Sequence, residues 1–312
     1  MRAARLYAPG DLRIETISDP EPGPGEVLVQ VEAALTDGTD LKAFRRGHPL
    51  LLSEAPSPFG HEFCGIDVAT GRRVVAANSA PCGECVHCLR NEQTLCENLL
   101  PLLNGAYAEL LLVPERIARV NLHPVPPTLA PEIAALIEPL ACALHATDVV
   151  AVQGRTVAVL GSGPMGMLLG ACLKDAGADV SIAGGSRPRR ELAAEFGATP
   201  GDALDADVVI EATGSPLGWQ DAVRAVRRGG TVVLFSGVPG DVELDAYRLH
   251  YDELTLRGSF HHTPRTVRAA LAFLASGAYP WHKLLTHEVR LDGLPAFFAD
   301  PPDGYLKAIV RP

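Results

Sequence analysis

The stretch that decides the fold is Thr156-Val157-Ala158-Val159-Leu160-Gly161-Ser162-Gly163-Pro164-Met165-Gly166, a short apolar run that leads directly into a glycine-rich turn. A helical pattern follows and continues to about Ala176. In such a strand–turn–helix unit, Gly161 makes the tight turn, Gly163 lets the backbone approach a ligand, and Gly166 lets the helix pack closely on the strand. The helix N-terminus offers free N–H groups and a positive dipole end. The stretch therefore predicts that a dinucleotide pyrophosphate binds here, at Gly161, Gly163, Pro164, Met165 and Gly166. An ordinary glycine-rich turn is the alternative.

The residues that follow this unit repeat its alternation of apolar run and helical pattern. Further apolar runs at Asp179–Ile182, Asp207–Ile210 and Thr231–Phe235 alternate with helical patterns. This alternation is typical of βαβ units, in which helices cover both faces of a parallel sheet. We therefore expect a doubly wound α/β domain over residues 128–257.

The flanking regions differ in character. Before residue 128, short β-prone runs such as Val27–Val31 are separated by Pro/Gly clusters such as Pro20–Gly25, a pattern typical of β-rich structure. After Gly258 we expect one helix, Arg265–Ser276, and a closing strand, Lys307–Val310. Residues 1–127 and 258–312 are thus expected to form one β-rich domain into which the α/β domain is inserted.

Length and charge exclude several classes of protein. The 312 residues suffice for two domains. The formal net charge of −10 argues against nucleic acid or an anionic membrane as the main partner. No apolar run reaches the roughly 20 residues of a membrane span, and the N-terminal residues lack the apolar segment of a signal peptide. We expect a cytoplasmic protein without a membrane partner.

Four of the seven cysteines lie within fifteen residues, and the other three are scattered. The spacing Cys82-x2-Cys85-x2-Cys88-x7-Cys96 can wrap one tetrahedral zinc ion, and four protein ligands leave no open position, so this zinc site would be structural. Four incidental thiols are the alternative. The scattered cysteines are more often small buried residues than ligands, although Cys64, close to His61, could stand in as one; they are Cys64, Cys142 and Cys172.

The end of the second predicted strand bears on the choice of dinucleotide. NAD-binding proteins usually carry a carboxylate there, which accepts a hydrogen bond from the ribose 2′-hydroxyl. Here the strand runs into Gly184-Gly185-Ser186-Arg187, so a hydroxyl and a guanidinium stand where a 2′-phosphate would lie. We predict NADP(H) rather than NAD(H), bound by Gly185, Ser186 and Arg187. A solvated helix start is the alternative for Arg187.

A second set of chemical residues is dispersed. His61 stands beside Glu62 after a Pro-rich approach, Glu138 precedes Pro139 where a helix would begin, and Asp37 lies in a predicted turn. Each also has an ordinary explanation, as a loop histidine, a helix-end charge or a turn former.

The combination of motifs resembles the medium-chain dehydrogenase/reductase family, the zinc-dependent alcohol and polyol dehydrogenases. The resemblance covers essentially the whole chain and implies a GroES-like catalytic domain with an inserted Rossmann domain, in a homodimer or homotetramer joined through Rossmann-domain edges. The motifs are Pro22–Val27, Gly38–Asp40, Gly60–Glu62, the four-cysteine loop, Glu138–Ala141 and the glycines at 161–166.

The resemblance also implies a catalytic zinc held by Asp37, His61, and Glu62 with Glu138. Asp37 departs from the family pattern, which has cysteine there; a carboxylate is a harder donor but a recognised zinc ligand. Glucose dehydrogenases of halophilic archaea are similar in having Asp-Gly-Thr-Asp, which favours a sugar or polyol substrate. Thr39 matches the hydroxyl that starts the family's proton relay, and Lys42 stands where a relay histidine is often found; a solvated surface lysine is the alternative.

We therefore expect a zinc-dependent NADP(H) oxidoreductase that interconverts a small secondary alcohol and its carbonyl by hydride transfer. Two alternatives stay open: a zinc-free quinone or enone reductase, and a non-catalytic NADP-binding protein with a degenerate metal site.

Overall fold

The computed structural model describes residues 1–48, 55–202 and 204–312. The chain forms two compact units, Met1–Glu138 with Thr263–Pro312, and Pro139–His262. The two divisions lie 11 and 5 residues later than the expected 127/128 and 257/258. The reason is local packing: helix α4 (Pro131–Ala134) packs on strands of the first unit, and the Ser259 N–H, beyond the last strand of the second unit, donates to the Leu234 carbonyl of that unit's sheet.

The first unit is built on two β-sheets. The larger has the order β15-β16-β3-β5-β6-β8, with β7 also paired to β3, and the smaller has the order β2-β1-β4. Neighbouring strands are antiparallel except β15 and β16. The strands are β1 (Arg2–Ala8), β2 (Asp11–Thr16), β3 (Val27–Leu35), β4 (Ser57–Pro58), β5 (Glu62–Asp67), β6 (Arg73–Ala76), β7 (Leu110–Val113), β8 (Leu122–Pro124), β15 (Leu285–Arg290) and β16 (Lys307–Arg311).

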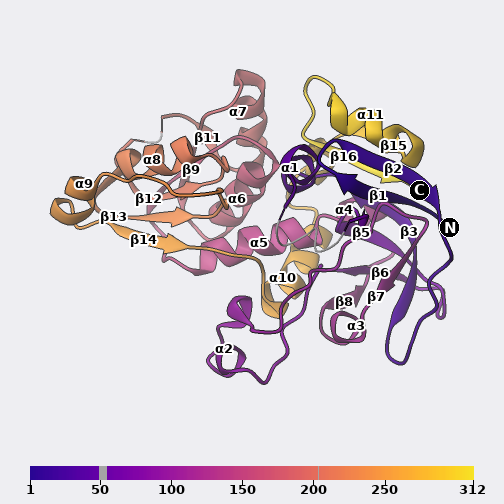
Figure 1. Cartoon of the computed structure of the whole chain (residues 1–312). Coiled ribbons are helices and arrows are strands. Elements are labelled where there is room, and N and C mark those ends of the chain that lie inside the picture. The colour runs from indigo at the N-terminus through magenta and orange to yellow at the C-terminus, as the bar shows by residue number, and fades with distance from the viewer. Residues whose placement is uncertain (49–54, 203) are drawn as a thin grey trace. The chain divides into compact units, whose positions relative to one another are not determined.

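The closing strand returns to the N-terminal part of the chain, as predicted. In β16, Ile309 pairs with Leu35 and Val310 with Ala34 of β3, and Figure 1 shows this yellow segment among the indigo strands of the same unit. Helices and short 3-10 turns surround the sheets: α1 (Gly38–Arg46), α2 (Val86–Leu89), η1 (Gln93–Leu95), α3 (Glu115–Asn121), α4 (Pro131–Ala134), α10 (Pro264–Ala275), η3 (Trp281–Leu284), η4 (Leu291–Gly293) and α11 (Leu294–Ala299). Helix α5 (Ile137–Asp148) begins in this unit and continues into the second.

An aromatic cluster fills the core of the first unit. Phe59 packs edge-on against Tyr107 with ring centroids 5.6 Å apart, and lies 5.4 Å from Phe298, which also contacts Phe44 at 5.7 Å. These side chains are buried among the aliphatic residues of β1, β3 and β7. The cluster fixes the ends of the strands that carry the site described below.

The second unit contains a parallel sheet in the order β11-β10-β9-β12-β13-β14. The sequence order reverses at the β9–β12 pair, which is the position where α/β sheets bind ligands. The strands are β9 (Thr156–Leu160), β10 (Asp179–Ala183), β11 (Thr199–Pro200), β12 (Ala206–Glu211), β13 (Val226–Leu234) and β14 (Thr255–Gly258). The doubly wound α/β prediction is confirmed.

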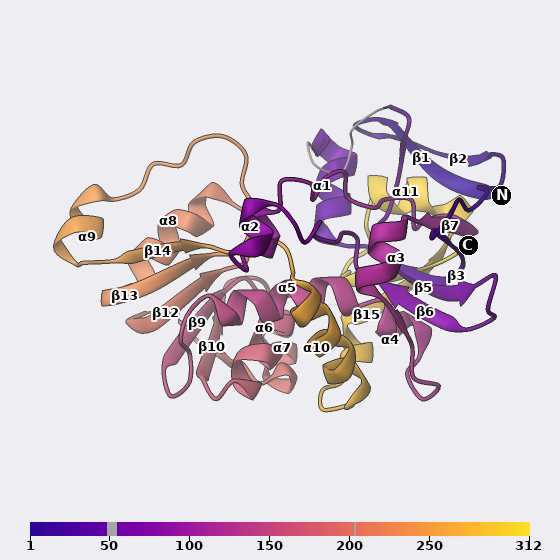
Figure 2. The same cartoon turned by 90° about the horizontal axis from the view of Figure 1, so that it is seen from below.

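Helices cover both faces of this sheet. Right-handed crossovers place the helices that connect β9, β10 and β11 on one face of the sheet and those that connect β12, β13 and β14 on the other. Figure 2 shows α8 and α9 on the side opposite α6 and α7. The helices are α6 (Pro164–Asp175), α7 (Arg187–Ala193), η2 (Ala194–Phe196), α8 (Pro216–Ala225) and α9 (Ala246–Tyr251).

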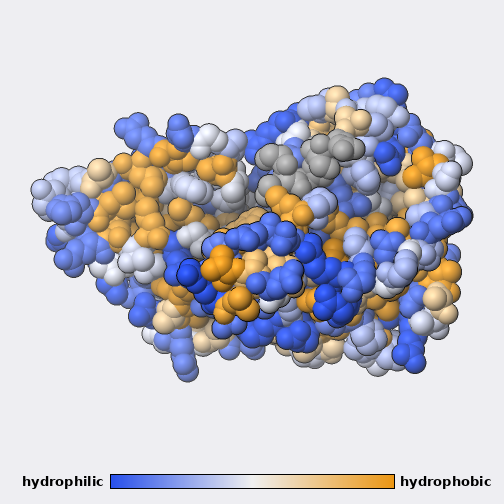
Figure 3. All heavy atoms as spheres, turned by 60° about the horizontal axis from the view of Figure 1, so that its bottom comes forward, coloured by the Kyte–Doolittle hydropathy of each residue, from blue (hydrophilic) through white to orange (hydrophobic). Residues whose placement is uncertain are grey.

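The surface mixes polar and apolar residues. Figure 3 shows hydrophilic and hydrophobic residues interspersed over one face of the molecule, and large exposed apolar side chains include Leu89 and Tyr247. Within the described ranges, no helix has the length and apolar character required to cross a membrane.

Candidate functional site

Asp37 lies at the start of a helix rather than in the predicted turn. It is the N-cap of α1: its Oδ1 accepts a hydrogen bond from the Asp40 N–H at 2.7 Å, and Asp40 Oδ2 accepts one from the Asp37 N–H at 3.2 Å. This reciprocal capping box satisfies two N–H groups that a helix start leaves without partners. One oxygen of Asp37 therefore caps α1, and Oδ2 remains for another partner.

That partner is His61, which directly precedes β5. Its Nδ1 lies 3.2 Å from Asp40 Oδ1, and its Nε2 lies 3.8 Å from Asp37 Oδ2. Since a carboxylate only accepts, Nδ1 carries a proton toward Asp40, and Nε2 is the nitrogen at which a metal would take the place of a second proton. The side chain is buried; burial lowers the pKa of His61, but the charges of Asp40 and Asp37 outweigh it and raise the pKa well above its ordinary value.

Glu62, the next residue, is paired with a lysine from the other end of the chain. Lys307 Nζ donates to Oε1 at 2.6 Å and to Oε2 at 2.7 Å, and also to the Thr36 carbonyl at 3.2 Å. Both side chains are fully buried. Burial opposes the ammonium charge of Lys307, but the Glu62 carboxylate overcomes it and raises the lysine's pKa.

The donor atoms of Asp37, His61 and Glu62 lie within 4.8 Å of one another. Glu138, also buried, lies in the first turn of α5, which begins at Ile137, so it is not the residue before the helix as predicted. It is close enough for its charge to raise the pKa of His61. The imidazole nitrogen and carboxylate oxygens are suitable ligands for zinc. The acidic surroundings of His61 favour a cation, so the residues fit a bound metal.

Thr39 and Lys42 lie on α1 beside this group, and both are half-buried. They are three residues apart and so share one face of the helix. His48, which follows α1, is also half-buried; burial lowers its pKa, while the charge of Asp37 acts in the opposite direction.

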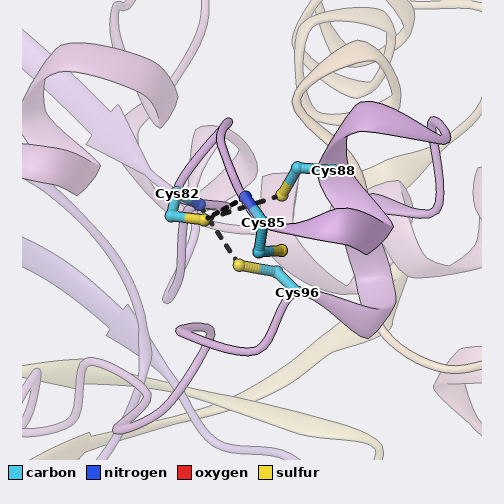
Figure 4. Close-up of side chains that lie close together, drawn as sticks. All are labelled: Cys82, Cys85, Cys88 and Cys96. Atoms are coloured by element: carbon cyan, nitrogen blue, oxygen red, sulfur yellow. Dashed lines mark hydrogen bonds between the residues drawn. The ribbon is translucent and has the colours of Figure 1, made fainter.

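The four cysteines converge within one loop (Figure 4). Their sulfur atoms lie within 4.8 Å of one another, and Cys82 Sγ is 3.9 Å from Cys88 Sγ. Four sulfurs around one zinc ion would be about 3.8 Å apart. Backbone N–H groups point at the sulfurs, as from Cys85 to Cys82 at 3.4 Å and from Cys82 to Cys96 at 3.2 Å. Donation from backbone N–H groups, of Glu84 above all, lowers the pKa of Cys82 to about 6, which favours the thiolate that a metal requires.

The glycine-rich turn after β9 has the backbone that its sequence predicts. Gly161 has φ +116°, and a Cβ on Gly166 would lie 1.8 Å from the Gly161 carbonyl oxygen. A Cβ on Gly163 would meet no described atom within 4 Å, so the backbone there is open to a ligand. Gly163 is the N-cap of α6, Pro164 and Met165 form its first turn, and a glycine cap has no side chain to occupy the helix N–H groups. The turn therefore fits a pyrophosphate.

A cavity of about 400 Å³ lies within the second unit at the carboxyl ends of β9, β10 and β12. Its size suits part of a dinucleotide. Residues that line it include Gly161, Gly184, Thr213, Gly218, Asp221 and Arg224.

The loop after β10 reaches the glycine-rich turn. Ser162 Oγ donates to the Gly184 carbonyl at 2.9 Å, and Arg190 donates to the Gly185 carbonyl at 2.6 Å. Ser186 is the N-cap of α7, and Arg187 is exposed, with its guanidinium 2.7 Å from Glu191. Arg187 thus forms an exposed ion pair with Glu191, and its guanidinium is free to release Glu191 and bind another anion.

Several residues of these sites were not assigned from sequence. Tyr107, Lys307 and His48 lie near the donor group, and nothing in their spacing along the sequence indicates this. Asp40 differs, because the pair Asp37 and Asp40 has the spacing of a capping box.

Comparisons with known proteins agree with this architecture. The family model described as Alcohol dehydrogenase GroES-like domain matches residues 23–127, and the one described as Zinc-binding dehydrogenase matches residues 202–276. Among curated proteins, L-threonine 3-dehydrogenase of Xanthomonas oryzae pv. oryzae is 28% identical, with 89% of each chain covered. Sorbitol dehydrogenase of Bacillus subtilis is 29% identical over 94% of this chain and 91% of that protein.

Solved structures extend the likeness to the whole chain. A protein described as a zinc-binding dehydrogenase of Sinorhizobium meliloti 1021, bound to NADP, is 32% identical with a TM-score of 0.88, covering 100% of this chain and 99% of that one. The 2R,3R-butanediol dehydrogenase of Bacillus subtilis is 28% identical with a TM-score of 0.86, covering 100% of this chain and 99% of the other. The chain therefore belongs to the medium-chain family of zinc-binding dehydrogenases, the alcohol and polyol dehydrogenases.

Proposed function

We propose that the protein interconverts a secondary alcohol, a sugar or polyol, and its carbonyl, with NADP(H) as the hydride carrier and a zinc ion bound at the Asp37 group. The observation that carries the proposal is the acidic pocket around His61. Asp37 and Asp40 each lie within 4 Å of the imidazole, and Glu62 is adjacent but already paired with Lys307. A cation at Nε2 would balance the remaining carboxylate charge.

Asp37 and His61 would hold the zinc ion, with Glu62 or Glu138 as further donors. Zinc bound there supplies a Lewis acid that makes the substrate hydroxyl more acidic. Thr39 Oγ1 would accept the released proton and pass its own on to solvent, and Lys42, three residues further along α1, would donate a hydrogen bond to a substrate hydroxyl. Bound at the glycine-rich turn, NADP⁺ would supply the acceptor for the carbinol hydride, so that alcohol and NADP⁺ would give carbonyl, NADPH and one proton.

The substrate class is supported by two independent features. The sequence Asp37-Gly38-Thr39-Asp40 resembles that of sugar-oxidising dehydrogenases. Relatives bear the names sorbitol dehydrogenase and 2R,3R-butanediol dehydrogenase, which act on polyhydric alcohols.

The preference for NADP(H) rests on the loop after β10. No carboxylate stands at positions 183–187, and Arg187 would exchange Glu191 for a 2′-phosphate. The Sinorhizobium meliloti relative was solved with NADP bound. The test is the ratio of kcat/KM for NADP⁺ to that for NAD⁺, which we expect to fall in Arg187→Ala but not in the control Arg189→Ala on the same helix. Equal ratios in wild type and Arg187→Ala would exclude the assignment.

Metal analysis tests the catalytic zinc. Two zinc ions per chain, together with turnover of a sugar or polyol from a panel that includes simple alcohols, would support the proposed reaction. One zinc ion, at the cysteines, would indicate a non-catalytic protein with a degenerate site. No zinc, together with reduction of quinones or enones, would indicate the zinc-free reductase.

We further propose a homodimer or homotetramer and a cytoplasmic location. Strand β14 is at one end of the second unit's sheet, and the strand at the other end, β11, contains Pro200, which has no N–H to offer a partner strand. Two copies would pair through β14, and Leu256→Pro should then reduce the mass measured by light scattering. None of the cysteines, all of which lie within the described ranges, forms a disulfide, as expected in a reducing compartment.

A further inference from the structure

Tyr107 is a fully buried tyrosine that does not touch the candidate zinc ligands itself but contacts Asp40, which does. Its hydroxyl donates to Asp40 Oδ2, and the Leu35 carbonyl lies 3.1 Å from the same hydroxyl. A phenol has a single proton, and hydrogen bonds to charged acceptors are the stronger ones, so the proton lies on the Asp40 side.

Asp40 in turn connects to both candidate ligands. Its Oδ1 is 3.2 Å from His61 Nδ1, and its Oδ2 accepts the Asp37 N–H at 3.2 Å. One carboxylate therefore sets the ring orientation of His61 and the backbone position of Asp37. The Tyr107 hydroxyl adds a third hydrogen bond, which further restricts rotation of this carboxylate about its own side-chain bond.

The ring of Tyr107 is held independently of its hydroxyl. It packs edge-on against Phe59 and lies 6.1 Å from Phe298. A Cβ on Gly60 would lie 2.6 Å from the ring, so the backbone immediately before His61 is in close contact with it. The Tyr107 N–H also donates to the Phe59 carbonyl at 3.0 Å. Removing the hydroxyl alone would leave this frame in place.

We propose that Tyr107 is a positioning residue for the zinc site, whose hydroxyl orients the Asp40 carboxylate and thereby aligns His61 and Asp37 as ligands. The inference rests on the proposed function, because it takes Asp37 and His61 to hold the metal.

The test is Tyr107→Phe in the full chain, loaded with Co²⁺ and titrated with a chelator. Thiolate-to-cobalt absorption in the near ultraviolet reports the cysteine site, and the weak visible bands of a nitrogen–oxygen site report the Asp37 group. Changes in groups that orient metal ligands typically cost 10–100-fold in affinity, so we expect the Asp37 group to lose Co²⁺ at about 10-fold lower chelator concentration while the cysteine site is unchanged. We also expect kcat of the zinc-loaded enzyme to fall while the KM for NADP⁺ stays the same.

A double-mutant cycle distinguishes positioning from general stabilisation. If Tyr107 acts through Asp40, then Tyr107→Phe should have little further effect on Co²⁺ affinity in an Asp40→Asn background. The control is Tyr7→Phe, which also removes a hydroxyl bonded to a carboxylate, that of Glu15 at 2.7 Å, and should leave both metal sites intact.

The outcomes separate the two proposals. If wild type binds two metal ions and Tyr107→Phe retains both as tightly, the positioning role is overturned and the proposed function stands. If wild type binds metal only at the cysteines, the proposed function fails and the positioning role fails with it.

Discussion

The four-cysteine loop and the Asp37 group both gather metal donors within one unit, yet they do so by different routes. The cysteines come from fifteen consecutive residues, 82–96, and their contacts are mostly with one another and with their own backbone. Asp37, His61, Glu62 and Lys307 come from the α1 cap, the approach to β5, β5 and β16, and their donors and acceptors are bonded to protein partners.

The difference concerns what holds each site together. Thiolates that share a small volume repel one another, so we expect a bound metal to stabilise the converged loop. In the Asp37 group, hydrogen bonds and an ion pair already fix the side chains. We infer that a metal organises the first site, whereas the protein organises the second before any metal binds.

The largest expected effect is that of Lys307→Met, which would leave the Glu62 carboxylate buried without its cation. Removing one partner of a buried pair typically costs about 3–5 kcal/mol, so urea denaturation of the metal-free protein should show a loss of that size in the free energy of unfolding. The double variant Glu62→Met with Lys307→Met should recover most of it. A loss below about 1 kcal/mol in the single variant would break the claim that protein contacts organise this region.

Removal of metal from the cysteine loop should have the next largest effect. A ligand at 100 times its Kd stabilises the folded state by about 2.7 kcal/mol, so Cys82→Ser in the presence of zinc should lose stability of this order. Hydrogen exchange should accelerate over residues 82–99 and remain slow in β3 and β5. Unchanged exchange in the loop would show that it, too, holds itself together.

Two substitutions of Asp37 separate its roles as helix cap and as ligand. Asparagine caps helices as well as aspartate does, whereas alanine costs about 1 kcal/mol. Without metal, Asp37→Ala should therefore lose about that much stability and Asp37→Asn almost none. Both should lose the second zinc ion and most turnover. If Asp37→Asn keeps metal and activity, then Asp37 is a cap and not a ligand.

The smallest expected effect is a control in the second unit, away from both sites. Asp207 accepts hydrogen bonds from Thr156 and pairs with Arg227, and the backbone N–H of Thr156 is the main cause that lowers the pKa of Asp207 to about 2. Because its folded pKa lies below the unfolded value of about 3.9, its contribution to stability is present above that value and is lost as the pH falls toward 2.

Wild type should therefore exceed Asp207→Asn in stability by less than about 1 kcal/mol at pH 6, since the pair is partly exposed. Urea denaturation at pH 6 and pH 2.5 would measure the difference, which should shrink at the lower pH. A difference that is independent of pH would assign the effect to lost hydrogen bonds alone.

The sequence predicts features that depend on neighbouring residues and misses those that depend on distant ones. The strands β9 and β10, the glycine turn and the cysteine loop follow from periodicity and spacing, because each is made by consecutive residues. The partner of Glu62 does not, since 245 positions separate it from Lys307. A single lysine in an apolar closing strand looks like an edge charge until the β16–β3 pairing places it in the core.

The sequence also does not predict the start of helix α1 at the site, for a related reason. The run Asp37–Asp40 reads as a turn because aspartate and glycine favour turns, and only the packing of Phe44 into the aromatic core shows that a helix follows. The sequence likewise does not indicate that Tyr107 belongs to the site, because Asp40, which it contacts, lies 67 positions away.

The pairing of Glu62 with Lys307 has a consequence for how the chain is made. At synthesis rates of about 5–20 residues per second, roughly 12–50 s pass between the translation of the carboxylate and that of its cation. During that time the second unit, which is continuous in sequence, can emerge from the ribosome and fold, while the first unit still lacks the strand that neutralises its interior. A nascent chain that stalls before residue 307 lacks the ammonium group with which the Glu62 carboxylate forms its ion pair, so burial of Glu62 there would require its protonation.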